Sequence, residues 1–188
     1  ALVAAAASGD RDRVRALAPY DLSDMAGDAA GLLAALGIER AHIVGSSLGG
    51  MIAQRVAIEH PASTASLTSI MSTTGESHVG QPSDEAMAAL VAPEPTSKRE
   101  YVAQAVAASE VWSSRRYFDA VEAGALAKAS YDRSMIDGGV ARQLAAMLAS
   151  GTTAELLPSL EVAALVIHGL DDTLIAPSGG ERTAELIP

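Results

Sequence analysis

The chain of 188 residues has no cysteine, few aromatic residues and few basic residues. Without cysteine it can form no disulfide framework, no thiolate zinc site and no cysteine nucleophile, and the redox compartment stays open. Aromatic residues make up 3% of the chain and hydrophobic residues 49%. Alanine, leucine, valine and isoleucine must therefore fill the core of what the length predicts to be one domain.

Basic residues are outnumbered by acidic ones, which gives a formal net charge of −10. We expect no nucleic-acid or membrane partner, because no basic patch is available to neutralise phosphates. Residues 2–7 are apolar, but the run is too short to span a bilayer and lacks the basic segment of a signal peptide. We therefore expect a cytoplasmic protein; its oligomeric state is left open.

The most informative stretch, residues 41–58, reads as a strand, a sharp turn and a helix. Its turn, Gly45-Ser46-Ser47-Leu48-Gly49, has the Gly-x-Ser-x-Gly pattern of a nucleophile elbow. This pattern makes Ser47 the candidate nucleophile, in strained backbone geometry that exposes its hydroxyl. Gly45 and Gly49 are expected to be required because a side chain at either position would collide across the turn.

Leu48 follows the candidate nucleophile at the predicted start of the helix, where its free N–H could stabilise an oxyanion. Two other interpretations exist. The stretch could be an ordinary glycine-rich turn with incidental serines, or Ser46 could be the nucleophile. The glycine spacing favours Ser47 as the central residue.

The chain resembles the α/β-hydrolase superfamily in this elbow and in segments on either side of it. Residues 19–26, His60-Pro61 and residues 66–72 are similar to the small-molecule esterase branch, which includes polyketide methyl esterases, enol-lactonases and proline iminopeptidase-like enzymes. The resemblance implies an α/β fold with a mostly parallel sheet, an inserted helical lid and a Ser-Asp-His triad.

Two helices are predicted before the elbow. Residues 2–17 read as a short alanine-rich helix followed by a charged break at residues 10–13. A second helix is amphipathic, begins with Asp21 or Ser23 as N-cap and ends at Gly37 in the C′ position. It leads into the elbow strand, and the alternation of strands and helices predicts a parallel sheet.

Between the predicted strands at residues 66–71 and 163–168, the sequence predicts four helices, at about residues 83–91, 96–112, 119–133 and 138–149. This block is similar to a lid. We divide the chain into residues 1–74 (core with the elbow), 75–160 (lid) and 161–188 (rest of the core). Candidate residues for an apolar substrate pocket share a large side chain in this block: Trp112, Tyr117, Phe118, Tyr131, Met135 and Met147. Such residues are more often plain core.

The last predicted strand ends in His168-Gly169-Leu170-Asp171-Asp172, which resembles the acid turn of the superfamily. The resemblance assigns the triad acid to Asp172, where a carboxylate would orient the imidazole of the base. Asp171 is the competitor and is expected to be a turn or cap residue. Thr173 stands where the family usually has proline. No cofactor or metal is implied.

The triad histidine should follow the acid in this fold, yet no histidine follows Asp172. His168 is expected to be structural, His60 to end its helix, His42 to pack within the elbow strand, and His78 to lie in an exposed loop. A second oxyanion donor is also missing before Pro19. These absences predict an internal fragment of a longer protein, although a pseudoenzyme that lost its base is an alternative.

The sequence thus predicts a serine hydrolase that acts on an ester or related acyl bond of a small, largely apolar molecule. Ester, lactone, amide and peracid chemistry all remain open. These 188 residues alone are expected to be inactive, because the base lies outside them. The alternative is a non-catalytic member of the fold that binds a small ligand.

Overall fold

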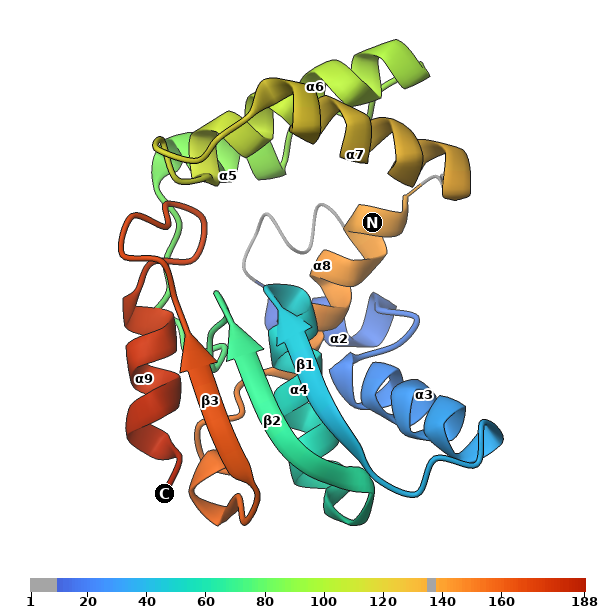
Figure 1. Cartoon of the computed structure of the whole chain (residues 1–188), viewed down its shortest axis with the longest axis vertical. Helices are drawn as coiled ribbons and strands as arrows, with labels where there is room; N and C mark the ends of the chain where they lie inside the picture. The colour runs from blue at the N-terminus through green and yellow to red at the C-terminus, as the bar shows by residue number, and fades with distance from the viewer. Residues whose placement is uncertain (1–9, 135–137) are drawn as a thin grey trace.

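A parallel sheet forms the centre of the molecule in the computed structural model, which describes residues 10–134 and 138–188. Its strands within these residues are β1 (Ala41–Ser46), β2 (Thr64–Ile70) and β3 (Ala163–Ile167), in the order β1-β2-β3. Ile43 pairs with Leu67, and Leu67 pairs with Ala164. The strands are parallel, as predicted, so they end at the same edge, and β2 is followed in the sheet directly by β3 (Figure 1).

The helices α3 to α8 agree with the predicted ones to within a few residues, whereas residues 2–9 of the predicted alanine-rich helix lie outside the described residues. The described helices are α2 (Arg11–Leu17), α3 (Leu22–Ala35), α4 (Leu48–Glu59), α5 (Asp84–Leu90), α6 (Lys98–Trp112), α7 (Ala120–Arg133), α8 (Gly139–Ser150) and α9 (Ser178–Leu186), with short 3-10 turns at Pro61–Ser63 and Leu157–Ser159. None of the described helices is long and apolar enough to cross a membrane.

Capping explains where the first helices begin and end. Asp21 caps α3 in a capping box with Asp24, and Gly37 follows its end at φ +69°, both as predicted. The charged segment at residues 10–13 is not a break: Asp10 accepts a hydrogen bond from Arg13 N–H and so caps α2. An acidic residue at an N-cap satisfies the free N–H groups of the first turn, which corrects that prediction.

The core lies between α4 and one face of the sheet. Leu67, Ala53, Ala57 and Leu160 form a buried cluster, and partly buried side chains, among them Ile43, pack against it. The alanines on α4 let the helix lie close to the strands. This packing fixes the start of α4 relative to the ends of β1 and β2.

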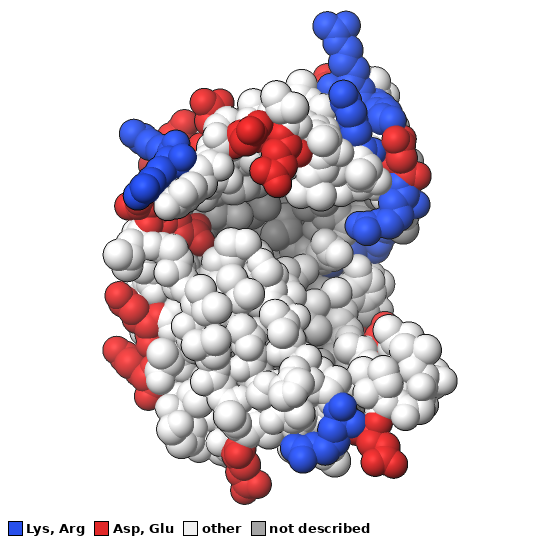
Figure 2. Space-filling view, viewed as in Figure 1, with Lys and Arg blue, Asp and Glu red and all other residues white. Residues whose placement is uncertain are grey.

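The opposite face of the sheet is open within the described residues. Figure 2 shows this face as a largely uncharged surface. Val44, Leu165 and Ile167 are exposed on it. His42 is exposed as well and hydrogen-bonds Ser66 Oγ across the strands, so the prediction that it is a packing residue of the elbow strand is wrong.

The helices between β2 and β3 form a block whose parts differ in position. Figure 1 shows α5, α6 and α7 beyond the carboxyl ends of the strands. In contrast, α8 packs on α2 through Val14 and Ala145. Its end is also tied to α3, because Leu22 N–H donates to Ser150 Oγ at 2.7 Å. The block is thus anchored to the core through α8.

Candidate active site

Ser47 lies in the turn between β1 and α4 with φ 55° and ψ −123°. A positive φ is rare for a residue with a side chain, and it marks the strain that the elbow pattern predicts. The last residue of β2 and a residue just after this strand hold the Ser47 backbone on both sides. Ser47 N–H donates to Ile70 O at 2.9 Å, and Ser72 Oγ–H donates to Ser47 O at 2.8 Å.

The glycines around Ser47 are not equivalent. A Cβ on Gly45 would collide with the backbone carbonyl of Gly49, so glycine is required at position 45. A Cβ on Gly49 would meet open space, which contradicts the predicted collision there. The second tight position is Gly50, where a Cβ would come 2.5 Å from Ser72 Cβ. The close approach of β2, which the elbow pattern alone does not contain, creates this second requirement.

Leu48 is the first residue of α4, as predicted. The first N–H groups of a helix have no intrahelical acceptor, and the helix dipole places partial positive charge there. The N–H of Leu48 therefore lies beside the Ser47 hydroxyl in a position typical of an oxyanion donor.

A buried polar network fixes α4 below the elbow. Gln54 is fully buried, accepts a hydrogen bond from Thr153 Oγ1 at 2.6 Å and donates to Ser69 Oγ at 3.3 Å. Thr153 N–H also donates to Thr74 O at 2.9 Å. Buried polar groups that are satisfied in this way hold one arrangement, so the network ties the elbow helix to the segments after β2 and before β3.

A cavity of about 420 Å³ adjoins Ser47 and Leu48. Figure 2 shows the surface hollowed between the helical block and the strand ends. Most of the lining side chains are apolar and come from α4, the loop after β2, α5, α8 and the loop after β3: Met51, Val79, Pro82, Met87, Leu90, Val140, Leu144, Met147, Leu148, Leu174 and Ile175. Polar lining comes from Thr73, Glu76, Ser77, Gln81 and Gln143.

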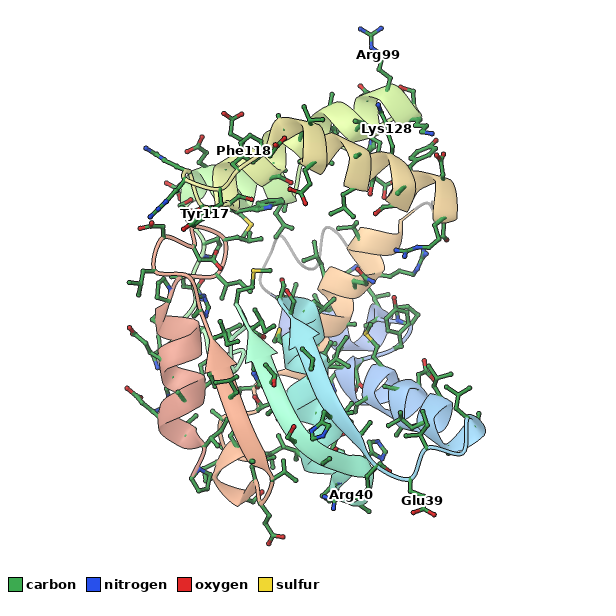
Figure 3. All side chains as sticks on the ribbon, viewed as in Figure 1. Glu39, Arg40, Arg99, Tyr117, Phe118 and Lys128 are labelled. Carbon is green, nitrogen blue, oxygen red and sulfur yellow. The ribbon has the colours of Figure 1, made fainter. Side chains whose placement is uncertain are left out.

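The aromatic residues predicted to line the pocket do not line this cavity, and that prediction is wrong. Trp112 is at the end of α6, and Tyr131 packs against Tyr101 with the ring centroids 5.4 Å apart. Figure 3 labels Tyr117 and Phe118 at the turn between α6 and α7. Tyr117 is 74% exposed there, and the Arg116 guanidinium lies over its ring. Tyr131 and Tyr117 thus make these contacts within the helical hairpin.

Of the two methionines named with them, Met147 lines the cavity as predicted. Met135 lies outside the described residues. The cavity wall that the sequence did not indicate is the apolar face of α8, with Val140, Leu144 and Leu148. Their spacing of four residues was visible in the sequence, but it does not say which way the helix faces.

Asp172 lies in the loop after β3, two strands from Ser47 and at the same edge of the sheet. At the usual strand spacing the axes of β1 and β3 are about 10 Å apart. Its Oδ1 accepts hydrogen bonds from the N–H groups of Leu174 and Ile175, both at 2.9 Å. Since those two residues line the cavity, the loop of Asp172 and Ser47 border the same space, whereas Asp171 is exposed.

The side chain of His168 is 8% exposed and contacts this loop. Its Nε2 lies 2.7 Å from Ile175 O and 3.5 Å from Asp172 Oδ2, and its ring packs on Gly180 of α9. It thus braces the loop, in keeping with the predicted structural role. His60 ends α4 and His78 is an exposed loop residue, again as predicted.

Glu76 is a charged residue in the cavity wall that sequence reasoning did not single out. Its Oε2 accepts hydrogen bonds from Arg182 Nε at 3.1 Å and from Thr74 Oγ1 at 2.9 Å. The Arg182 hydrogen bonds hold the pKa of Glu76 below its usual range; burial opposes this shift and Thr74 adds to it. No sequence signal was available, because Arg182 is 106 positions away.

Nothing in the described parts of the chain has the makings of a metal centre, since no three His, Asp or Glu side chains gather there. The arrangement instead offers a hydroxyl on a strained turn, a helix N-terminus beside it and an apolar cavity. These features suit nucleophilic attack on a small acyl compound.

A sequence profile described as the alpha/beta hydrolase fold matches residues 7–188. A protein of Yersinia enterocolitica named as a carbamate hydrolase, RutD, is 49% identical over 53 residues, which are 28% of this chain and 19% of that protein.

Two solved structures of hydrolases are similar along most of the chain. A hydrolase from Pseudomonas aeruginosa shares 28% identity at a TM-score of 0.67, over 90% of this chain and 61% of its own. The esterase RhEst1 from a Rhodococcus species shares 26% identity at a TM-score of 0.66, over 87% of this chain and 59% of its own. The chain therefore spans about three fifths of the length of these structures.

Proposed function

The chain belongs to the α/β-hydrolase family, and we propose that Ser47 is the nucleophile with which it cleaves an ester or related acyl bond of a small molecule. The observation that carries the proposal is the position of Ser47, in a positive-φ turn that borders a mainly apolar cavity of about 420 Å³. Cavities of this size and polarity suit small molecules. The relatives named as a carbamate hydrolase and an esterase support acyl chemistry.

In this proposal, Ser47 Oγ attacks the acyl carbon while a histidine outside these residues takes its proton. The N–H of Leu48 donates to the oxygen on which negative charge develops. When the tetrahedral adduct collapses, the leaving group departs with a proton from the histidine, and water then releases the acid by the reverse sequence of proton transfers.

Asp172 is proposed to orient that histidine. Its Oδ1 is held by two N–H groups of its own loop, and its Oδ2 lies 3.5 Å from a His168 nitrogen that is closer to Ile175 O. Oδ2 can therefore accept a hydrogen bond from an imidazole N–H, and the buried surroundings strengthen that bond.

We further propose that the helical block within residues 75–160 acts as a lid over the cavity. Residues from α5 and α8 already form part of its wall. A wall made by an inserted helical block would exclude water from the acyl intermediate and shape the substrate site.

The test is labelling by a fluorophosphonate probe, with mass spectrometry to locate the modified residue in the complete protein that contains this chain. We expect labelling at Ser47 and none in Ser47→Ala. Ser46→Ala is the matched control, because it removes the neighbouring hydroxyl and should leave labelling intact. Labelling at Ser46, or tight small-molecule binding with no labelled serine, would instead support the alternative of a non-catalytic binding protein.

The 188 residues alone provide a second test. An unactivated serine hydroxyl is a weak nucleophile, so we expect their hydrolysis of p-nitrophenyl acetate to match that of Ser47→Ala. Turnover well above the variant would mean that a base, such as His168 or His78, acts within the chain.

A further inference from the structure

The formal charge that the described residues place on the cavity wall is negative. Among the described residues that line it, Glu76 is the only one with a formal charge, and its side chain is 16% exposed. Arg182, which pairs with Glu76, belongs to α9 and does not line the cavity. A molecule in the cavity therefore lies against Glu76, whereas Arg182 is outside the cavity lining.

The two oxygens of Glu76 are engaged unequally. Oε2 accepts from both Arg182 Nε and Thr74 Oγ1 at 3.1 Å or less. Oε1 has only the longer contacts, at 3.5 Å from an Arg182 nitrogen and 3.9 Å from His78 Nε2, among the contacts of the described chain. Oε1 thus retains the capacity to accept a further hydrogen bond.

The carboxylate also stays ionised. Hydrogen bonds from Arg182 keep the pKa of Glu76 below its usual range, so Glu76 carries a negative charge at neutral pH. Ligand groups next to it are surrounded by apolar side chains such as Met51, Met147 and Leu148, where charge interactions are screened less than in water.

From this arrangement we propose that Glu76 sets the substrate class: the cavity accepts acyl compounds whose chain is neutral or carries an ammonium or N–H donor, and rejects those that carry a carboxylate. The inference rests on the proposed function only in taking this cavity as the substrate site. An anionic chain would lose its hydration and meet a like charge with no cation on the wall, whereas an N–H donor would gain Oε1.

The test is a binding measurement that needs no catalysis. Methionine methyl groups labelled with ¹³C report on the cavity through Met51, Met87 and Met147, and Met25 and Met71, which do not line it, serve as internal references. The protein is titrated with hexanol, hexylammonium and hexanoate, which share one chain length. We expect the first two to bind with a Kd at least about tenfold lower than that of hexanoate.

Two variants separate selection by charge from a merely structural ion pair. Glu76→Gln should bring the three Kd values to within about threefold of one another, because the repelling charge is gone. Arg182→Gln should widen the discrimination, because Glu76 loses its counter-charge. Glu185→Gln removes the other carboxylate that Arg182 contacts and should change nothing, since Glu185 does not line the cavity.

Equal binding of hexanoate and hexanol by the unchanged protein would overturn the inference, as would shifts in the same direction in Glu76→Gln and Arg182→Gln. Neither result depends on Ser47. Failure of fluorophosphonate labelling would instead overturn the proposed function and leave the binding preference standing.

Discussion

The elbow helix α4 is packed more tightly against the rest of the molecule than the α6–α7 hairpin. Around the elbow, α4 buries Met51, Val56 and Ala57 and is tied down by the Gln54 network. In contrast, α6 has no buried residue and α7 has only Ala127. The two helices pack mainly against each other, and α6 also packs against α5. The site geometry is thus fixed by the core, whereas the hairpin is held chiefly by its own pairing and is the part with freedom to move.

The two regions also differ in how glycine is used. Gly45 lies where the chain passes too close to itself for a side chain. A Cβ at Gly124 of α7, in contrast, would lie 3.6 Å from the nearest side-chain atom on α6, which is an ordinary contact distance. The first glycine is a steric necessity and the second is not. The same substitution should therefore have opposite effects in the two regions.

The largest expected effect comes from the core beneath the elbow. Leu67 is 1% exposed and central to the cluster with Ala53, Ala57 and Leu160. We expect Leu67→Ala to lower the free energy of unfolding by about 2–5 kcal/mol, measured by urea denaturation. The matched change in the hairpin, Leu126→Ala, removes a side chain that is 69% exposed and should stay within about 0.5 kcal/mol. Equal losses would mean that the hairpin is packed as tightly as the core.

Substitution of these two glycines should give the next largest effect on stability. Gly45→Ala is expected to cost about 1–3 kcal/mol or more, because the backbone must shift away from Gly49. Gly124→Ala should instead stabilise α7 by about 0.5–1 kcal/mol, since its Cβ meets only an ordinary contact. Thermal unfolding of both variants checks this, and a destabilising Gly124→Ala would show that the hairpin interface has no room.

Substitution of Ser72 should have a smaller effect on stability and should also slow the reaction of Ser47. Ser72→Ala removes the hydroxyl that donates to Ser47 O, so we expect a loss of about 1 kcal/mol and roughly tenfold slower fluorophosphonate labelling of Ser47. Thr64→Val is the matched control, because it removes a buried hydroxyl that donates to His60 O at the start of β2 and does not bond Ser47. It should cost similar stability and change the labelling rate by less than about twofold; equally slow labelling would refute a positioning role for Ser72.

The smallest effect is the pH dependence of the Glu76 and Arg182 pair. Because the pKa of Glu76 is lowered in the folded protein, its contribution to stability is present above the ordinary glutamate pKa and is lost as pH falls through the lowered value. The difference in Tm between the protein and Glu76→Gln should thus be largest near pH 7 and vanish at strongly acidic pH. A difference that persists there would mean that packing, and not charge, accounts for it.

Much of the elbow could be predicted because its determinants are local. The five residues 45–49 contain the turn, and the apolar patterns on either side predict the strand and the helix that position Ser47. The parallel order of the strands followed from the same alternation. The N-cap of α3 and the glycine after it were predicted for the same reason.

The cavity wall could not be predicted because it depends on how distant segments meet. The sequence places α8 correctly, but only the packing of the helix on α2 decides that Val140, Leu144 and Leu148 line the cavity. The aromatic residues did not indicate the cavity, since Tyr117, for example, packs under the Arg116 guanidinium at the hairpin turn. The requirement for Gly50 also comes from a neighbour on another segment, Ser72.

The order of the strands also bears on how the molecule folds. β1 and β2 are joined by a single helix, whereas β2 and β3 are neighbours in the sheet although residues 71–162 separate them along the chain. Closing so long a connection costs chain entropy before any β2–β3 contact compensates for it, while the α6–α7 hairpin can form locally and early. We expect the elbow to take shape around β1 and β2 first. The loop of Asp172 would then reach Ser47 only when β3 pairs, in the slowest step of folding.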